Sequence, residues 1–329
     1  MYRVEREGRL MSFNIIGTGS AYPKKVVKND DLAIFLDTSD EWIRTRTGIG
    51  ERRVCTDENM NDLAVISAKK ALENANILAE DVDLIICATL GGDFVTPSTA
   101  CYIQKEIGAK CPAFDVNAAC SGFIYAMDIA CGYFSRGKVK NVLITVAECM
   151  SSLLDWEDRS TCVLFGDATA SVVLEEGDGL KSIYTSATGN NNVLRIKDLR
   201  QNTPWKENKN SEKGLYMNGQ EVFKFAVSSM VRDVRRVIKE AGLKEEDVDV
   251  VLPHQANMRI IDFAKEKLNI PKDRYYTNIE RFGNTSAVGI PLLLDELNNM
   301  GKLNKDDIIV MSAFGGGLTS GACIIKWNK

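Results

Sequence analysis

The sequence predicts an α/β protein built from two copies of one unit, each a mixed sheet covered by helices. Helix-like and strand-like segments alternate along the 329 residues. The segment 71–85 resembles 237–251, with an Asp-Val-Asp triplet that recurs 166 residues later. The Gly turns at 136–138 and 300–302 each precede an apolar strand. Residues 166–173 also resemble 317–325, which makes three matches in the same order.

The amino-acid composition excludes several classes of function. A net charge of −4 gives no bulk attraction to nucleic acid or to an anionic membrane, so we expect neither as a partner. The nine cysteines lack metal-ligand spacing and only one histidine accompanies them, so we expect reduced thiols and no metal site. No signal peptide or membrane-length apolar run is recognisable. We therefore expect a cytoplasmic protein with a loose tail at 1–10, one half at 11–176 and a second half at 177–329.

The first half opens with a strand pattern from Ser12 to Gly17, followed by a loop and a helix across 27–38. Thr38 or Ser39 then caps a helix that has acidic residues in its first turn. The Gly-broken basic segment 45–53 follows. Its arginines beside Trp42 suit a nucleotide phosphate and base, and a solvated surface is the alternative.

The remaining elements continue the alternation of amphipathic helices and apolar strands. We expect a helix at 60–75, a strand at 84–88, a helix at 99–107 capped within 96–98, a buried strand at 113–116, a helix from 123, a strand at 141–146, and a strand within 161–173 broken by Gly166-Asp167. The polar segment 189–218 between the halves, which contains Trp205, is either a lid or tunnel wall or a tolerated surface insertion.

Cys120 lies between the strand at 113–116 and the helix that begins at 123, among small residues. We expect it on a tight strand-to-helix turn, where free N–H groups at the helix start point at its sulfur and favour the thiolate. This is the arrangement of a nucleophile elbow with sulfur in place of oxygen. The alternative is a small buried cysteine that packs as a hydrophobe.

The second half offers partners for Cys120. A shift of 166 residues carries Cys120 onto Ser286, in a second small-residue turn that contains Asn284 and opens a helix at 290–297. The single histidine, His254, follows a buried strand, where α/β folds place their sites. Three glycines, 315–317, follow the last long strand and could present N–H donors to a ligand.

Four motifs together resemble the 3-oxoacyl-[acyl-carrier-protein] synthase III family, the initiating condensing enzymes of bacterial type II fatty acid synthesis. They are Asn-Ala-Ala-Cys-Ser-Gly-Phe at 117–123, Pro-His-Gln-Ala-Asn at 253–257, Gly-Asn-Thr-Ser-Ala at 283–287 and Phe-Gly-Gly-Gly at 314–317. The resemblance runs from about residue 15 to 327. It implies a thiolase-like fold with αβαβα layering and a homodimer.

The resemblance also implies a mechanism in which Cys120 takes an acyl group from acyl-coenzyme A, with the backbone N–H groups of Cys120 and Gly316 as the oxyanion hole. His254 and Asn284 then stabilise the enolate formed when malonyl-acyl-carrier-protein loses CO₂. Coenzyme A is part of the substrate, and no cofactor is expected. The implied coenzyme A contacts are Thr38, Trp42, Arg46, Arg159, Phe223 and Asn257. The implied contacts to the acidic carrier protein are Lys224, Arg259 and Lys267, which otherwise read as solvated charges.

In this family, the residue before the proline at 97 reaches across the dimer and closes the partner's acyl pocket, and many members have Phe there. This chain has Thr96, with Phe94 two residues upstream. We therefore expect an open pocket unless Phe94 fills it, and acceptance of four-carbon or branched primers at least as good as that of acetyl.

Two rival functions stay open. The first is a secondary-metabolite ketosynthase of the same subfamily, and the second is a non-catalytic homologue that binds acyl groups. Other relatives fit less well: elongating synthases need two histidines, thiolases use a second cysteine as base, and hydroxymethylglutaryl-coenzyme A synthases use a glutamate near the nucleophile.

Overall fold

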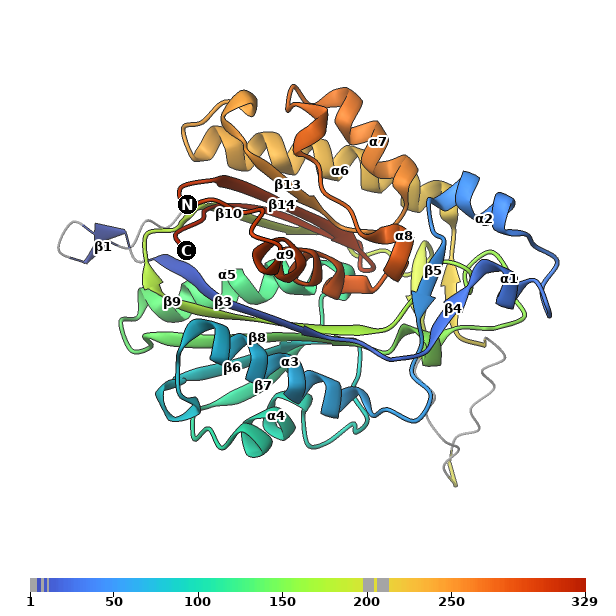
Figure 1. Ribbon diagram of the computed structural model, residues 1–329. Coiled ribbons are helices and arrows are strands. Elements are labelled where there is room, and N and C mark those ends of the chain that lie inside the picture. Colours follow the sequence, from blue (N-terminus) through green and yellow to red (C-terminus); the bar gives the residue numbers. More distant parts are fainter. Residues whose placement is uncertain (1–4, 7–8, 11, 198–203, 206–212) are drawn as a thin grey trace.

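The computed structural model describes residues 5–6, 9–10, 12–197, 204–205 and 213–329 (Figure 1). Within these residues, helices and sheets stack in five layers, so the predicted αβαβα arrangement is confirmed. One outer layer holds α3 and α4, the middle layer holds α5 and α9, and the other outer layer holds α6 and α7. Their bounds are α3 Met60–Ala75, α4 Thr99–Ile107, α5 Gly122–Ser135, α6 Gly219–Glu240, α7 Met258–Lys267 and α9 Gly289–Asn299.

The first sheet has the order β3-β9-β8-β6-β7. Its strands are β3 Ser12–Ala21, β6 Leu84–Ala88, β7 Ala113–Val116, β8 Asn141–Glu148 and β9 Ala168–Gly177. Strands β8, β6 and β7 are parallel, whereas β9 is antiparallel to both β3 and β8. All five residues of β6 are buried, because helices cover both faces of the sheet.

The second sheet repeats this order as β10-β15-β14-β13, which supports the predicted duplication. Its strands are β10 Leu180–Ala187, β13 Val250–Pro253, β14 Ile308–Gly315 and β15 Thr319–Lys326. Strands β13 and β14 are parallel, and the neighbouring pairs of strands are antiparallel. A parallel bridge between Val251 and Tyr275 occupies the position of the fifth strand.

The largest core lies between the two sheets, around α5 and α9. These two helices carry buried side chains on more than one face, such as Ile124 and Ala126 in α5 and Leu292 and Leu294 in α9. A helix that is apolar on all sides has to be enclosed, whereas α6 keeps one polar face towards solvent. The sequence pattern of α5 thus explains why it lies in the middle layer.

Smaller elements form the side of the molecule near the cavity described below. They are β4 Val26–Lys28, α1 Asn29–Leu32, α2 Asp40–Thr47, β5 Glu51–Arg53, β11 Leu194–Ile196, β12 Leu215–Met217 and α8 Ile279–Phe282. At the N-terminus, β1 Glu5–Arg6 pairs with β2 Arg9–Leu10, within the segment that was expected to be a loose tail. The rest of that segment, 1–4 and 7–8, lies outside the described residues.

Several predicted bounds need correction. Strand β3 continues past Gly17 to Ala21, and the last strand of the first half begins only at Ala168, after the Gly-Asp pair. Strand β7 was expected to be buried, but its residues are half-buried because β7 is an edge strand. The helices at 60–75 and 99–107 and the strand at 84–88 have the predicted bounds, and the Ser39 hydroxyl caps α2 as expected.

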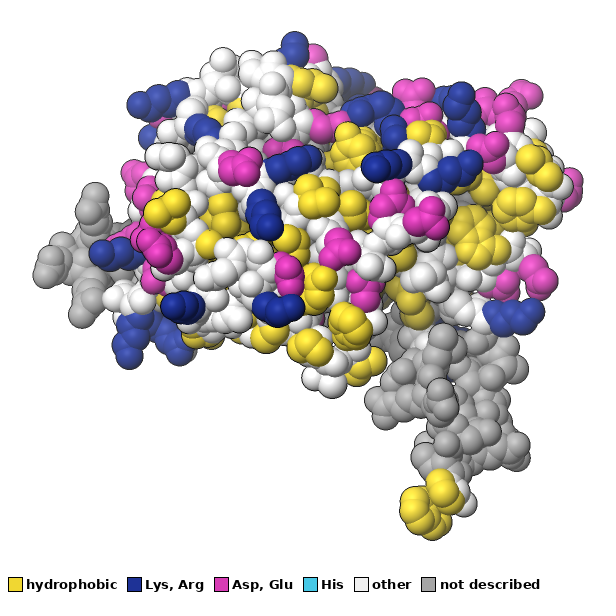
Figure 2. Space-filling model, turned by 60° about the horizontal axis from the view of Figure 1, so that its bottom comes forward, with side chains coloured by type: hydrophobic (Ala, Val, Ile, Leu, Met, Phe, Trp, Pro, Cys, Tyr) yellow, Lys and Arg dark blue, Asp and Glu magenta, His cyan; other side chains and the backbone are white. Residues whose placement is uncertain are grey.

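The face shown in Figure 2 carries positive and negative side chains interspersed with each other, as the small net charge would suggest. Among the described residues, no helix is both long enough and apolar enough to cross a bilayer.

Candidate active site

A cavity of about 1370 Å³ collects the candidate residues from both halves of the chain. It is lined by Cys120 from the first half and by His254, Asn284, Ser286 and Gly316 from the second. The two small-residue turns that the duplication predicted therefore meet at one site.

The first turn connects β7 to α5 through a 3-10 turn, Ala119–Ser121. The Asn117 side-chain oxygen accepts a hydrogen bond from the Ala119 N–H at 3.1 Å, and Ala119 has a left-handed backbone with φ 47°. Cys120 follows immediately, two residues before Gly122, the first residue of α5. The tight strand-to-helix turn expected for Cys120 is therefore present.

The second turn has the same construction. The Asn284 side-chain oxygen accepts from the Ser286 N–H at 2.9 Å, and Ser286 has φ 53°. By backbone geometry Ser286 corresponds to Ala119, and Cys120 to Ala287. The predicted equivalence of Cys120 with Ser286 was wrong by one residue, because β14 follows β8 at 167 residues rather than 166.

The end of β14 fixes the position of Cys120. A Cβ atom on Gly315 would lie 2.7 Å from the Cys120 backbone nitrogen, so only glycine fits there without displacing the turn. Gly316 follows, and a Cβ there would lie 3.5 Å from the Ala119 Cβ. The glycine run therefore packs against the nucleophile's turn, whereas a flexible loop would leave this space open.

Burial opposes ionisation of the Cys120 thiol. It raises the pKa of Cys120 to about 12, and a charge on Glu148 raises it further. The Ser286 hydroxyl, 3.5 Å from the Cys120 sulfur, and the Cys120 backbone N–H both lower this pKa. The helix start was expected to favour the thiolate, and the Cys120 N–H does lower this pKa, but desolvation is the larger effect in the resting site.

His254 is held as a neutral imidazole. Its backbone N–H donates to the Ser312 carbonyl at 2.8 Å, and its ring packs edge-on against Phe314 at 5.1 Å. Burial lowers the pKa of His254 to about 3. Its Nδ1 atom is buried and has no hydrogen-bond partner among the described residues. A neutral ring still carries one N–H, so His254 can donate one hydrogen bond without being a cation.

Asn284 is oriented by its own turn. Because its side-chain oxygen already accepts from Ser286, its amide NH₂ group is the part left to donate to a ligand in the cavity. Asn284 and His254 can thus supply two neutral donors from the second half.

Sequence reasoning missed Glu148, the last residue of β8. Its side chain is 1% exposed. One carboxylate oxygen accepts from the Leu90 N–H at 3.1 Å and the other from the Ser286 hydroxyl at 3.2 Å. Burial raises the pKa of Glu148 to about 8. The available signal was an acidic residue directly after the apolar run Val142–Ala147.

Four of the six residues expected to contact coenzyme A line the cavity: Trp42, Arg46, Phe223 and Asn257. Thr38 and Arg159 are not among its lining residues. The Arg159 guanidinium nonetheless lies 5.3 Å from the centre of the Trp42 ring and pairs with Asp37, and that of Arg46 lies 4.8 Å from the same ring. Trp42 and two arginines therefore form one cluster at the cavity.

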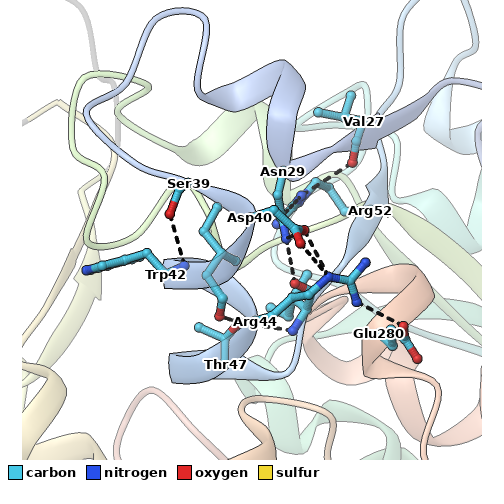
Figure 3. A network of polar contacts seen from close by, with 11 residues as sticks. Val27, Asn29, Ser39, Asp40, Trp42, Arg44, Thr47, Arg52 and Glu280 are labelled. Atoms are coloured by element: carbon cyan, nitrogen blue, oxygen red, sulfur yellow. Dashed lines mark hydrogen bonds and ion pairs between the residues drawn. The ribbon is translucent and has the colours of Figure 1, made fainter.

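Arg52 of the basic segment 45–53 is buried, so for this arginine neither the nucleotide-binding interpretation nor the solvated-surface alternative is correct. Arg52 is fully buried and donates to the Asn29 side chain and the Val163 carbonyl. Figure 3 shows the part of this network around Arg52 and Asn29, in which Asp40 links Asn29 to Arg44. Burial lowers the pKa of Arg52 to about 10.

The expected carrier-protein residues are exposed on neighbouring helices. Lys224 lies on α6 and pairs with Glu221, while Arg259 and Lys267 lie on α7. Phe223, next to Lys224, and Asn257, two residues before Arg259, line the cavity, so Lys224 and Arg259 lie near its rim, whereas Lys267 is at the other end of α7.

The segment 189–218 contributes to the cavity wall with β11 and β12. Leu194, Ile196, Leu215 and Met217 all line the cavity. This supports the tunnel-wall alternative for the described part of the segment, whereas 198–203 and 206–212 lie outside the described residues. Trp205 is 92% exposed. Thr96 and Phe94 do not line the cavity of their own chain, although Val95 between them does.

Comparison with known proteins gives consistent matches. Residues 114–192 match the family model "3-Oxoacyl-[acyl-carrier-protein (ACP)] synthase III", and 238–327 match the model of its C-terminal part. The chain is 46% identical to Beta-ketoacyl-[acyl-carrier-protein] synthase III of Clostridium acetobutylicum, over 97% of this chain and 99% of the relative. It is 48% identical to the same-named protein of Clostridium perfringens, over 95% and 98%.

Solved structures agree. The crystal structure of 3-oxoacyl-[acyl-carrier-protein] synthase III from Aquifex aeolicus is similar with a TM-score of 0.90 and 46% identity, covering 96% of this chain and 100% of the other. A priming beta-ketosynthase of the R1128 polyketide biosynthetic pathway also has a TM-score of 0.90, with 31% identity and 97% of each chain covered.

Proposed function

Because this chain belongs to the 3-oxoacyl-[acyl-carrier-protein] synthase III family, we propose that the cavity around Cys120 is where it performs the family's reaction. The protein is a condensing acyltransferase of fatty acid synthesis, with the thiolase-like fold of that family. It joins an acyl-coenzyme A primer to malonyl-acyl-carrier-protein and gives 3-oxoacyl-acyl-carrier-protein, coenzyme A and CO₂. The single observation that carries the site assignment is the meeting of Cys120, His254 and Asn284 in one cavity.

In the first half-reaction, Cys120 attacks the thioester carbonyl of the primer and forms an acyl-cysteine. The negative charge on the carbonyl oxygen is held by backbone N–H groups of Cys120 and Gly316. This role suits Gly316 because β14 brings the glycine run against the Cys120 turn. Collapse of the tetrahedral intermediate expels the coenzyme A thiolate.

In the second half-reaction, the neutral His254 and the Asn284 amide donate to the thioester carbonyl of the malonyl group. Loss of CO₂ leaves an enolate on that oxygen, and its carbon attacks the acyl-cysteine. A neutral imidazole is suited to this role because it donates a hydrogen bond but does not bring a full charge into the buried site. The chemistry is complete without a cofactor or metal, with coenzyme A serving as part of the substrate.

The cluster of Trp42, Arg46 and Arg159 would hold the nucleotide end of coenzyme A. Thr38, Phe223 and Asn257 would complete that binding surface. The acidic carrier protein would dock on Lys224, Arg259 and Lys267, of which the first two lie near the rim of the same cavity.

We also propose a homodimer and a cytoplasmic location. Among the described residues, β7 pairs only with β6, so its other edge is open to a second copy of the chain. A dimer would place Thr96 and Phe94 against the partner's acyl pocket. All nine cysteines lie in the described residues and are free thiols, which fits a reducing compartment.

The two rival functions can each be compared with the proposed one. A secondary-metabolite ketosynthase is favoured by the R1128 structure, but that protein is 31% identical, against 46–48% for the fatty acid synthesis enzymes. A non-catalytic homologue would not need Cys120, His254 and Asn284 to line one cavity.

The test is intact-protein mass spectrometry after incubation with acetyl-, butyryl- or isobutyryl-coenzyme A. We expect one acyl group per chain, located on Cys120, and 3-oxoacyl-carrier-protein once malonyl-acyl-carrier-protein is added. Cys120→Ser should not be labelled, whereas Cys101→Ser, at an exposed cysteine, should be labelled normally. Labelling of Cys120→Ser would refute the assignment. A preference for malonyl-coenzyme A over the malonyl-carrier-protein would favour the secondary-metabolite function.

A further inference from the structure

The mechanism above leaves one problem: the thiol of Cys120 must lose a proton inside a site where burial opposes its ionisation. His254 is poorly suited to accept this proton, since burial lowers its pKa to about 3. A proton acceptor for the first half-reaction therefore has to be sought elsewhere around the sulfur.

Ser286 is the side chain that connects the sulfur to an acid. Its hydroxyl oxygen lies 3.5 Å from the Cys120 sulfur and 3.2 Å from a carboxylate oxygen of Glu148. The hydroxyl has a single hydrogen, so it can donate to only one of these two groups at a time while accepting from the other. This is the connectivity of a one-proton relay.

The backbone holds this relay in place. The Asn284 side chain binds the Ser286 N–H and fixes the turn that carries the hydroxyl. The second oxygen of Glu148 is held by the Leu90 N–H, which fixes the carboxylate from the other side. Both Ser286 and Glu148 are buried, so water does not compete for these bonds.

The duplication explains the origin of the arrangement. Glu148 ends β8 as Gly315 ends β14, at the 167-residue offset of the two strands. Strand β14 packs against the turn of Cys120, and β8 packs against the turn of Ser286. At the first turn the strand ends in a glycine that makes room, whereas at the second it ends in a carboxylate that forms a hydrogen bond.

We propose that Glu148 accepts the Cys120 proton through Ser286, which makes Ser286 a catalytic residue of the acylation step and Glu148 the positioning residue that acts through it. The proposal rests on the proposed function, because it assigns the proton of that reaction's first half. As the S–H bond of Cys120 breaks, its proton passes to the Ser286 oxygen, and the Ser286 hydrogen passes to Glu148. The sulfur lone pair forms the bond to the acyl carbon, and the reverse transfer returns the proton to the departing coenzyme A thiolate.

The total charge of the site does not change when the proton moves from Cys120 to Glu148. One negative charge is shared between Glu148 and the sulfur, and a charge on Glu148 raises the pKa of the Cys120 thiol by repulsion. The other titratable groups that act on Glu148 are Cys149 and Asp167, and Cys87 on the neighbouring β6 is affected by it. The pKa of Glu148, raised to about 8, places its ionisation in an accessible pH range.

The test measures the rate at which iodoacetamide alkylates Cys120 in the full chain, by peptide mass spectrometry, from pH 6 to pH 10. Alkylation needs the thiolate but no acyl substrate. In the unmodified protein we expect the rate to rise with pH through a step near 8, as Glu148 becomes an ionised acceptor. Glu148→Gln and Ser286→Ala should each remove this step and slow alkylation at pH 8 by about 10²-fold.

The control is Ser171→Ala, which removes another fully buried hydroxyl that bonds to Ser67 and Thr145 away from the cavity. Ser171→Ala should keep both the alkylation rate of Cys120 and its step near pH 8. The proposal is overturned if Glu148→Gln keeps the step, or if either variant slows alkylation equally at every pH. Failure of acyl-coenzyme A to label the unmodified protein would instead overturn the proposed function and leave the alkylation result standing.

Discussion

The Ser286 hydroxyl oxygen lies 3.5 Å from the sulfur of Cys120, although the two residues are not equivalents in the repeated unit. Ser286 has the same left-handed backbone conformation as Ala119 and is its equivalent in the repeat. Cys120 is therefore equivalent to Ala287. The duplication therefore brings two copies of one turn together with different side chains. One turn carries the nucleophile, and the other carries the groups that hydrogen-bond to it and to the substrate.

Gly315→Ala should displace Cys120, because the new Cβ would lie 2.7 Å from the Cys120 backbone nitrogen. A misplacement of about 1 Å at a reacting atom costs on the order of 10²-fold in rate, so acylation should fall by at least that factor. The measurement is the rate of acyl-enzyme formation by mass spectrometry. Gly132→Ala in α5, where a Cβ meets nothing within 4 Å, should acylate normally. Normal acylation of Gly315→Ala would show that the turn has room to move.

His254→Ala and Asn284→Ala should mainly impair decarboxylation. Each removes a donor to the enolate oxygen, which is typically worth about 10²–10³-fold in rate. Release of CO₂ from malonyl-carrier-protein is the measurement, with acyl-enzyme formation in parallel. Asn298→Ala, whose amide binds Thr18 and Asn74, is the matched control. Equal losses in both half-reactions would contradict the division of labour.

Arg259→Glu should raise KM for malonyl-carrier-protein and leave acylation by acyl-coenzyme A nearly unchanged. The reason is charge reversal on the surface proposed to bind an acidic partner. Added salt screens this charge, so it should reduce the difference in KM between the variant and the unmodified enzyme. Lys138→Glu makes the same change in net charge at the turn after α5, at the end of that helix opposite Cys120. A salt-independent loss of both half-reactions would point to misfolding instead.

Glu148→Gln should change how stability depends on pH. The pKa of Glu148 is raised from 4.5 to about 8 by burial, so the folded chain keeps a proton that the unfolded chain releases. Stability contributed by this group therefore falls as pH rises from 4.5 to 8. Gln cannot ionise, so the variant should gain free energy of unfolding relative to the unmodified protein across this window. Urea unfolding at pH 5, 6.5 and 8 measures this.

Comparison of the Glu148→Gln variant with the unmodified protein cancels the contributions of the other titrating groups to the free energy of unfolding. The control Ser171→Ala should differ from the unmodified protein by the same free energy at each pH. A stability difference that is the same at all three pH values would contradict a raised pKa for Glu148.

Thr96→Phe should shift primer preference towards acetyl. If Thr96 of one subunit closes the pocket of its partner, its small side chain leaves space for longer acyl chains, and each buried methylene contributes about 0.8 kcal/mol. The unmodified enzyme should accept butyryl- and isobutyryl-coenzyme A at least as well as acetyl-coenzyme A, as measured by kcat/KM. A strong acetyl preference in the unmodified enzyme would instead identify another residue, such as Phe94, as the floor.

Local patterns determined much of this protein. The helix at 60–75 and the strand at 84–88 were predicted to the residue, because their apolar spacing lies within the segments themselves. The recurring Asp-Val-Asp and Gly-Lys turns revealed the duplication, and the turn of Cys120 followed from small residues between a strand and a helix. The motifs also led to the family.

Only the tertiary structure decided how these pieces act on one another. That Arg52 is buried and Arg46 lines the cavity depends on how α2 and β5 pack, since both arginines belong to one basic segment. Desolvation opposes the ionisation of the Cys120 thiol, and no local sequence pattern indicates this burial. Glu148 and Ser286 are 138 residues apart and meet because β8 ends against the turn of the other half. Such contacts arise from the packing of two sheets around α5 and α9, and periodicity along the chain carries no information about them.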